Sequence, residues 1–250
     1  HANKQETKKA ISYFEKALRA SEESGQNIYA SMMESNIANM YFSLVDYESA
    51  YMHVAKGYEE MRKHPEHPFY SNLLAILSIS EAKVGKMAEA KEHGQIALKS
   101  ATKKGSLIAI IVANLALGEV ANSENNYEEA KTFLSASLEL SEKYGQKPFI
   151  ILNSVGLLVA NLGTKNFLEA VVFGEKALSL VNDGGDQTSL YSIKKNLAAA
   201  YFGTGQFSQA YQSMHESHEI FRDVNSIENK KAINEILLKY DSEKKEWIVA

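Results

Sequence analysis

The sequence contains no cysteine, which excludes disulfide bonds, thiol catalysis and zinc sites built from cysteine. Only 3 of its 250 residues are proline, so few positions forbid a helix from continuing. No apolar run reaches the roughly 18 residues of a membrane-spanning helix. The net charge of -4 lacks the basic excess that marks nucleic-acid-binding domains. We therefore expect a globular chain that does not bind nucleic acid.

A forty-residue internal repeat is the main feature that is present. Self-similarity at a fixed period is the sequence signature of stacked supersecondary units. One column of the repeat is small, one is aliphatic and one is large and apolar. Their members are Ala10, Ala50, Ala90, Ala130, Ala170 and Ala210; Ile37, Leu77, Leu117, Leu157 and Leu197; and Tyr47, Met87, Tyr127, Phe167 and Phe207. Small residues let helices approach closely, so the repeat predicts tightly packed helix pairs.

Helix boundaries follow from the same register. Between the columns, apolar residues recur at intervals of three and four residues, which is the spacing of a helix. Gly25, Gly105, Gly145 and Gly185, with Pro65 in the missing place, fall where a helix has to stop. We predict an all-α chain with a first helix at 3–24 and a last helix at 226–248. The pairs between them are predicted at 28–44/47–62, 68–84/87–103, 107–123/127–143, 147–163/167–181 and 187–204/207–222.

The second helix of each pair resembles the tetratricopeptide (TPR) family. Ala50-x3-Val54-x2-Gly57 and Ala130-x3-Leu134-x2-Ser137 carry its small-large-small spacing, and the stretch 196–210 is close to its consensus. HEAT and armadillo repeats share the forty-residue length but lack this spacing. The TPR period is usually about 34 residues, so each pair here is about six residues longer. The resemblance implies a right-handed TPR superhelix, an α-solenoid, over 1–225, with a C-terminal capping or linker helix at 226–250.

The resemblance also implies a binding surface. In the TPR family, ligands contact particular positions of the first helices, which line the concave face of the solenoid. Carried over residue by residue, these positions predict a site for a peptide, a protein or a small molecule. The predicted site residues are Asn36, Asn39, Phe42, Lys83, Glu119, Asn122, Lys195, Asn196 and Phe202.

Catalytic motifs are not evident in the sequence. It has no HExxH, no nucleophile elbow and no phosphate-binding glycine-rich loop after a strand. His215 and His218 are three residues apart and could share a metal, but a solvated helix face explains them better. We expect no enzymatic activity, no cofactor and no metal.

The end of the chain resembles a second group of proteins. The run from Leu237 to Glu246, Leu-Leu-Lys-Tyr-Asp-Ser-Glu-Lys-Lys-Glu, is similar to the exit segment of periplasmic TPR sensor regions of Gram-negative gut bacteria. There it leads to a membrane span and then to a histidine kinase or a LuxR-type helix-turn-helix domain. The resemblance implies a periplasmic input region of a longer membrane protein, with the span downstream. Trp247-Ile-Val249 departs from the pattern.

Two tasks are expected of the last helix. Its early part should cap the solenoid and bury Ile227, Ile233, Ile236 and Leu237. Its later part continues a short heptad-like seam through Tyr240 and Trp247, which could pair with a second copy to form a homodimer. Two other functions remain open: a cytoplasmic peptide-binding regulator, and a protein-interaction scaffold.

Overall fold

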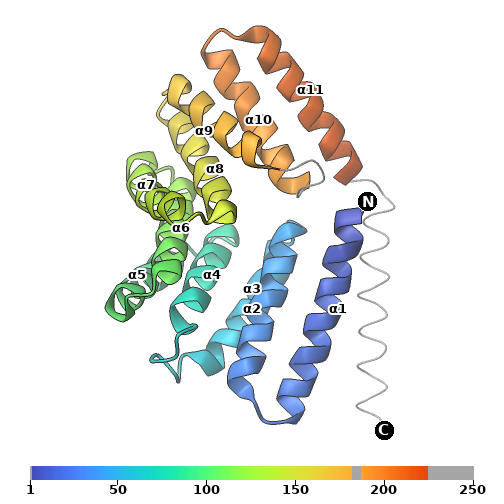
Figure 1. The fold of residues 1–250 in the computed structure, drawn as a ribbon, viewed down its shortest axis with the longest axis vertical. Coiled ribbons are helices and arrows are strands. Elements are labelled where there is room, and N and C mark those ends of the chain that lie inside the picture. Colours follow the sequence, from blue (N-terminus) through green and yellow to red (C-terminus); the bar gives the residue numbers. More distant parts are fainter. Residues whose placement is uncertain (1, 182–186, 225–250) are drawn as a thin grey trace.

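The computed structural model describes residues 2–181 and 187–224, and every regular element within these ranges is an α-helix (Figure 1). The helices are α1(Ala2–Glu23), α2(Asn27–Ser43), α3(Tyr47–Met61), α4(Tyr70–Lys83), α5(Met87–Lys104), α6(Leu107–Ser123), α7(Tyr127–Lys143), α8(Lys147–Gly163), α9(Phe167–Leu180), α10(Gln187–Gly203) and α11(Phe207–Val224). The all-α prediction is confirmed, and each described helix end lies within two residues of its predicted place. The helix predicted at 226–248 and its expected buried residues lie outside the described residues.

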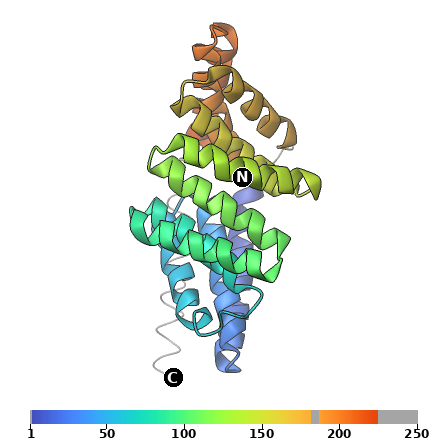
Figure 2. The ribbon, with the colours of Figure 1, turned by 90° about the vertical axis from the view of Figure 1, so that its left-hand side faces the viewer.

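The helices form successive antiparallel pairs stacked in chain order, as the side view in Figure 2 shows. We call the even-numbered members, α2 to α10, the first helices of the pairs, and α3 to α11 the second helices. Consecutive first helices contact one another, whereas no comparable contact joins consecutive second helices among the described residues. The first helices therefore line the inner side of the curve. This is a helical-repeat architecture of the α-solenoid kind.

The turn inside each pair uses one left-handed residue, which recurs every forty positions. The φ angles are 62° at Val45, 85° at Gly85, 60° at Asn125, 59° at Lys165 and 77° at Gly205. The turns between pairs use the predicted glycines at 25, 105 and 145, which also have positive φ. Gly185 lies outside the described residues. The turn between α3 and α4 has no left-handed residue and contains Pro65 instead. Sequence reasoning found the glycine turns between the pairs but not the left-handed turns inside them.

Small residues set the spacing of the pairs. Ala50, Ala90, Ala130 and Ala170 are fully buried. A Cβ placed on Gly163 of α8 would lie 2.3 Å from the Tyr127 ring of α7, so only glycine fits beneath that ring without a shift. The buried apolar residues form successive clusters that share helices: Ala113 belongs to one cluster and Leu115 to the next, although both are on α6. The core is therefore continuous along the stack.

The first and last pairs also approach each other. The Thr188 hydroxyl at the start of α10 donates to the Ser43 carbonyl at the end of α2, at 3.2 Å, across 145 positions of sequence. Figure 1 shows the arc that brings α10 and α11 back toward α1 and α2. The inner side of the curve is thus bounded by both ends of the stack. No helix within the described ranges is long and apolar enough to cross a membrane.

Candidate functional site

Three of the predicted site residues meet at the junctions of the first helices. Lys83 at the end of α4 forms an ion pair with Glu119 of α6, at 3.2 Å, and the two side chains are 29% and 25% exposed. The charge of Glu119 raises the pKa of Lys83, against the opposing effect of burial. Both charges therefore remain within reach of solvent while they join two repeats.

Asn122 continues this junction from α6 to α8. Its Nδ2 donates to the Gly156 carbonyl at 3.0 Å. Its Oδ1 is buried and accepts no hydrogen bond from the described residues. A Cβ on Gly156 would lie 3.2 Å from Glu119 Oε1, so the carboxylate also rests against α8. Together, Lys83, Glu119 and Asn122 form one polar group across three first helices, which we call the inner polar group.

The other predicted residues are not joined to this group by any described polar contact. On α2, Asn39 is exposed, Asn36 is half-buried, and the ring of Phe42 lies 5.9 Å from that of Tyr47. On α10, Asn196 bonds to its own helix at the Ser192 carbonyl. The predicted site is therefore divided into three groups along the arc.

Lys195 and Phe202 occupy an end of the stack. Lys195 lies over the Tyr191 ring at 5.8 Å. Phe202 is 68% exposed and its ring meets that of Phe207 edge-on at 5.5 Å. One repeat earlier, the positions of these two residues hold Val155 and Leu162, which are half-buried because α10 follows. The exposure of Lys195 and Phe202 thus reflects their place on the last described pair.

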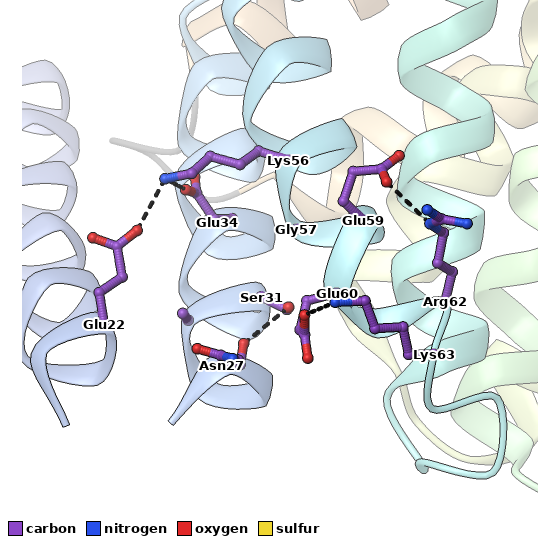
Figure 3. Close-up of a pocket in the computed structure, with 11 residues that line it drawn as sticks. Glu22, Asn27, Ser31, Glu34, Lys56, Gly57, Glu59, Glu60, Arg62 and Lys63 are labelled. Atoms are coloured by element: carbon purple, nitrogen blue, oxygen red, sulfur yellow. Dashed lines mark hydrogen bonds and ion pairs between the residues drawn. The ribbon is translucent and has the colours of Figure 1, made fainter. Parts of the chain in front are cut away.

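A pocket that sequence reasoning did not anticipate lies between α1, α2 and α3 (Figure 3). Its volume is about 410 Å³, within the range of small-ligand sites. Seven charged side chains line it, and each cation pairs with a glutamate. The pairs are Lys56 with Glu22 and Glu34, Arg62 with Glu59, and Lys63 with Glu60. A ligand that enters this pocket has to exchange contacts with these pairs.

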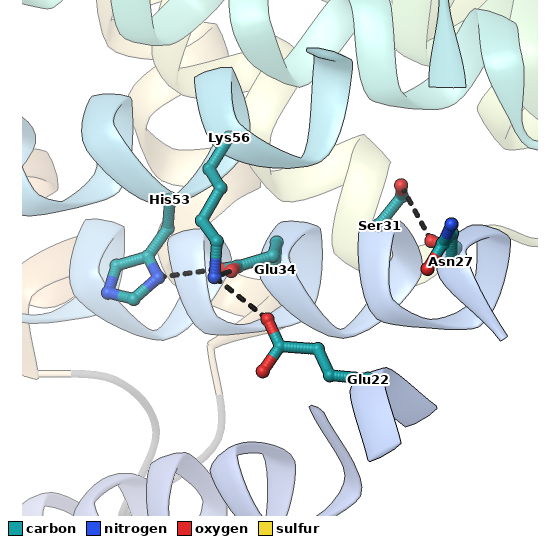
Figure 4. Close-up of polar contacts among 6 residues, drawn as sticks. All are labelled: Glu22, Asn27, Ser31, Glu34, His53 and Lys56. Atoms are coloured by element: carbon teal, nitrogen blue, oxygen red, sulfur yellow. Dashed lines mark hydrogen bonds and ion pairs between the residues drawn. The ribbon is translucent and has the colours of Figure 1, made fainter. Parts of the chain in front are cut away.

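Glu34 is the unusual member of the pocket. Its side chain is 3% exposed, yet it contacts two side chains of α3: His53 Nδ1 at 2.7 Å and Lys56 Nζ at 2.6 Å (Figure 4). Burial acts to raise the pKa of Glu34, but its contacts with His53 and Lys56 outweigh burial and lower it. Lys56 also reaches Glu22 of α1 at 3.0 Å. The carboxylate is therefore held ionised at the junction of three helices.

A sequence signal for this arrangement exists in the repeat. The position of Glu34 is filled by Leu74, Asn114 and Ser154 in the next three pairs. These three residues are buried, so a carboxylate in the same column predicts a buried partner. The bridge from Lys56 to Glu22 recurs as Lys176 to Glu142, so that contact belongs to the repeat itself. The stacking role of the Lys56 bridge weakens the argument that the pocket is a ligand site.

Two further histidines lie beside carboxylates. His93 Nδ1 of α5 donates to the buried Glu81 carboxylate of α4 at 2.8 Å, and the rings of His93 and Tyr58 meet in a T-shaped arrangement. The hydrogen bond with Glu81 raises the pKa of His93. His215 lies 4.0 Å from Glu219 on its own helix. Across residues 2–181 and 187–224, no three acidic or histidine side chains gather as metal ligands.

These features define the chain as an all-helical repeat protein. No family model and no curated protein matches it. Among solved structures it is similar to the crystal structure of BtubC (BKLC) from P. vanneervenii, with a TM-score of 0.64 and 16% identity. The match covers 88% of this chain and 92% of that chain. At this level of identity the likeness concerns the fold alone.

Proposed function

We propose that the chain is a binding module that takes up an extended peptide, or a small polar molecule, on the inner side formed by its first helices. The observation that carries this proposal is the inner polar group. Lys83 and Glu119 keep part of their charge exposed at a junction of three first helices. Peptide carbonyls, amides and charged side chains can exchange with such groups at low cost, because the pair is neither buried nor isolated.

The boundaries of the inner side favour a narrow ligand. The contact between Ser43 and Thr188 brings the two ends of the arc together. A folded domain needs roughly 800 Å² of accessible surface on each partner, which an enclosed face offers poorly. An extended segment needs only a line of polar and apolar contacts. We therefore favour a peptide segment over a globular partner.

We further propose that the architecture is a right-handed TPR superhelix. The support is the small-large-small spacing in α3 and α7 and the near-consensus stretch 196–210. The forty-residue period departs from the family by about six residues per repeat. On this reading the predicted residues Asn36, Asn39 and Phe42 belong to the same surface as the inner polar group.

The biological setting proposed is the periplasmic input region of a longer membrane-bound regulator. Its support is the resemblance of the segment from Leu237 to Glu246 to sensor exit segments. The output would be a histidine kinase or a LuxR-type domain, and this chain would act by binding rather than by catalysis. Reporter fusions to the full-length protein test the location. Activity of an alkaline phosphatase fused at residue 250 supports a periplasmic location. A cytoplasmic reporter signal instead favours the alternative, a cytoplasmic peptide-binding regulator or scaffold.

The binding proposal is tested by selection from a phage-displayed library of random twelve-residue peptides on the immobilised chain. We expect enrichment of a related set of sequences. The selection is repeated on the variant Lys83→Ala/Glu119→Ala, which removes both charges together. Loss of the enriched set with this variant supports the inner side as the site. An unchanged set would move the site elsewhere, with the pocket around Glu34 as the next place to examine.

A further inference from the structure

The hydrogen bond between Thr188 and Ser43 differs from the contacts that recur along the stack. Thr188 Oγ1, near the start of α10, donates to the Ser43 carbonyl at the end of α2, at 3.2 Å. Helices that follow one another in the stack share extended contacts, whereas α2 and α10 do not. The bond therefore joins the two ends of the arc at a small point of contact.

The acceptor of this bond is a carbonyl for which the other pairs provide no donor. Ser43 is the last residue of α2, where helix carbonyls have no partner within the helix. Among the described residues, no hydrogen bond reaches the equivalent carbonyls of the other first helices, at Lys83, Ser123, Gly163 and Gly203. The local fold of a helix pair therefore does not require a protein donor at this place.

The donor is equally particular to its pair. The equivalent positions of the earlier pairs hold side chains that cannot donate a hydrogen bond: Ile28, Pro68, Ile108 and Pro148. A hydroxyl occurs in this column only at Thr188, in the first helix that the arc brings back toward α2 (Figure 1). Donor and acceptor thus match across 145 positions of sequence, at a contact that stacking between neighbouring repeats does not explain.

We propose that the hydrogen bond between Thr188 and Ser43 is a clasp that closes the arc, and that its opening admits ligand to the inner side. This inference rests on the proposed binding at the inner side and adds how access to it is controlled. A single neutral hydrogen bond shifts an equilibrium between two states by roughly tenfold or less. Such a bond can hold the arc closed without making the closed form permanent.

The inner polar group is placed so that ligand binding acts on the clasp. The curvature of a solenoid is set by the small rotation between successive repeats. Lys83 and Glu119 join α4 to α6, and Asn122 joins α6 to α8. A ligand that exchanges with these contacts changes the rotation at two junctions, and the changes add up at the ends of the arc. Occupancy of the inner side and the state of the clasp are therefore coupled.

The clasp is tested first without any ligand. Because the chain has no cysteine, spin labels can be placed on Asn39→Cys of α2 and Lys195→Cys of α10, which are both exposed. Pulsed electron paramagnetic resonance then measures the distance between the labels. Thr188→Val removes the donor and keeps the side-chain shape, so we expect it to raise the share of long distances at least about twofold. Thr188→Ser, the matched control, keeps the donor and should retain the native distribution. An unchanged distribution in Thr188→Val would overturn the clasp.

The effect on access is tested with the clasp locked. The variant Ser43→Cys/Thr188→Cys is oxidised to an intramolecular disulfide, and the probe is a fluorescent peptide taken from the library selection. We expect the locked chain to associate with the peptide at least about tenfold more slowly, because little of it is competent to bind. Reductant should restore the rate, and Ser43→Cys alone should respond to neither treatment.

Two outcomes separate this inference from the proposed function. Equally fast association with the locked and reduced chains would overturn the clasp as a gate, although the peptide still binds. A selection that enriches no peptide would contradict the proposed function, and the distance measurement would still decide whether the clasp exists. Circular dichroism establishes that each variant keeps its helical content.

Discussion

Glu34 of α2 and Lys56 of α3 form an ion pair within the first helix pair, with 2.6 Å between Oε1 and Nζ. At the same two positions of the last described pair, Lys194 and Glu216 also form an ion pair, with the charges exchanged. The intervening pairs place Leu74 with Ile96, Asn114 with Ala136 and Ser154 with Lys176 there. The position thus tolerates either polarity, provided that the two residues match. The terminal pairs of the stack use opposite charges where α4 and α5 use two apolar residues.

This relationship predicts the outcome of a charge exchange. Glu34→Lys alone leaves two cations together at a buried position and should cost about 3–5 kcal/mol in the free energy of unfolding. Lys56→Glu alone should cost less, because Lys56 is largely exposed. The double variant Glu34→Lys/Lys56→Glu recreates the arrangement of the last pair and should recover part of the loss. Urea unfolding of the four proteins gives the coupling. Additive losses in the double variant would contradict the matched-pair account.

Val45 predicts a stabilising substitution. It is a β-branched residue at φ 62°, a conformation that costs a non-glycine residue roughly 1–2 kcal/mol, and its side chain is exposed. Gly85 and Asn125 fill the equivalent turns. We expect Val45→Gly and Val45→Asn to raise the stability by about 1 kcal/mol. Thermal unfolding measures the effect, with Val84→Ala beside the next turn as a comparison in which no left-handed strain is relieved. A fall in stability for both variants at residue 45 would contradict the inference that the backbone at Val45 is strained.

The pair of His93 and Glu81 predicts a pH dependence. The pKa of His93 is raised in the folded protein by its hydrogen bond to Glu81, with Glu92 and Glu89 nearby. A raised pKa means that the bond stabilises the fold fully below the unfolded pKa of about 6.5 and loses this effect as the pH rises through the folded value. The cost of His93→Gln in urea unfolding should therefore be largest at acidic pH and shrink at alkaline pH. In a Glu81→Gln background the cost should vary much less with pH, because only the weaker effects of Glu92 and Glu89 remain. A cost that grows with pH would refute the assignment.

The close contact between Gly163 and Tyr127 predicts that the effect of Gly163→Ala on stability depends on the Tyr127 ring. In the native protein, Gly163→Ala places a Cβ 2.3 Å from a ring that is held by a hydrogen bond to Asn125, and should cost about 1–3 kcal/mol. In a Tyr127→Ala background the space is free. The same substitution should then be neutral or stabilise by up to about 1 kcal/mol, because alanine favours the helix over glycine. An equal cost in both backgrounds would show that the ring does not require the glycine.

Much of the fold follows from the forty-residue register. The small column and the aliphatic column mark the packing faces, so helix limits can be placed to within two residues. The turn inside each pair was harder to recognise. Its left-handed residue is Val45, Gly85, Asn125, Lys165 or Gly205, and no single residue type identifies it. The backbone sets that conformation, and the helix packing on either side imposes it on residues that disfavour it.

The candidate site follows from the sequence only in part. Register places Lys83, Glu119 and Asn122 on first helices, and their contacts depend on how closely α4, α6 and α8 approach. The pocket around Glu34 was missed, because a glutamate within a helix reads as a solvated residue until the buried column is noticed. Lys195 and Phe202 match family positions in sequence. Their exposure depends on which segment follows the last pair, which the register alone does not state.

The central claim is that ligand binds on the inner side of the arc. The direct test is the Kd of a fluorescent peptide, taken from the library selection, for inner and outer variants of the chain. Asn39→Ala/Lys83→Ala alters exposed residues on two first helices, and Gln95→Ala/Glu139→Ala alters exposed residues on two second helices. The account predicts that the inner variant weakens binding at least about tenfold, equivalent to about 1.4 kcal/mol, while the outer variant leaves Kd unchanged. Weaker binding by the outer variant alone, with the inner variant unaffected, would contradict it.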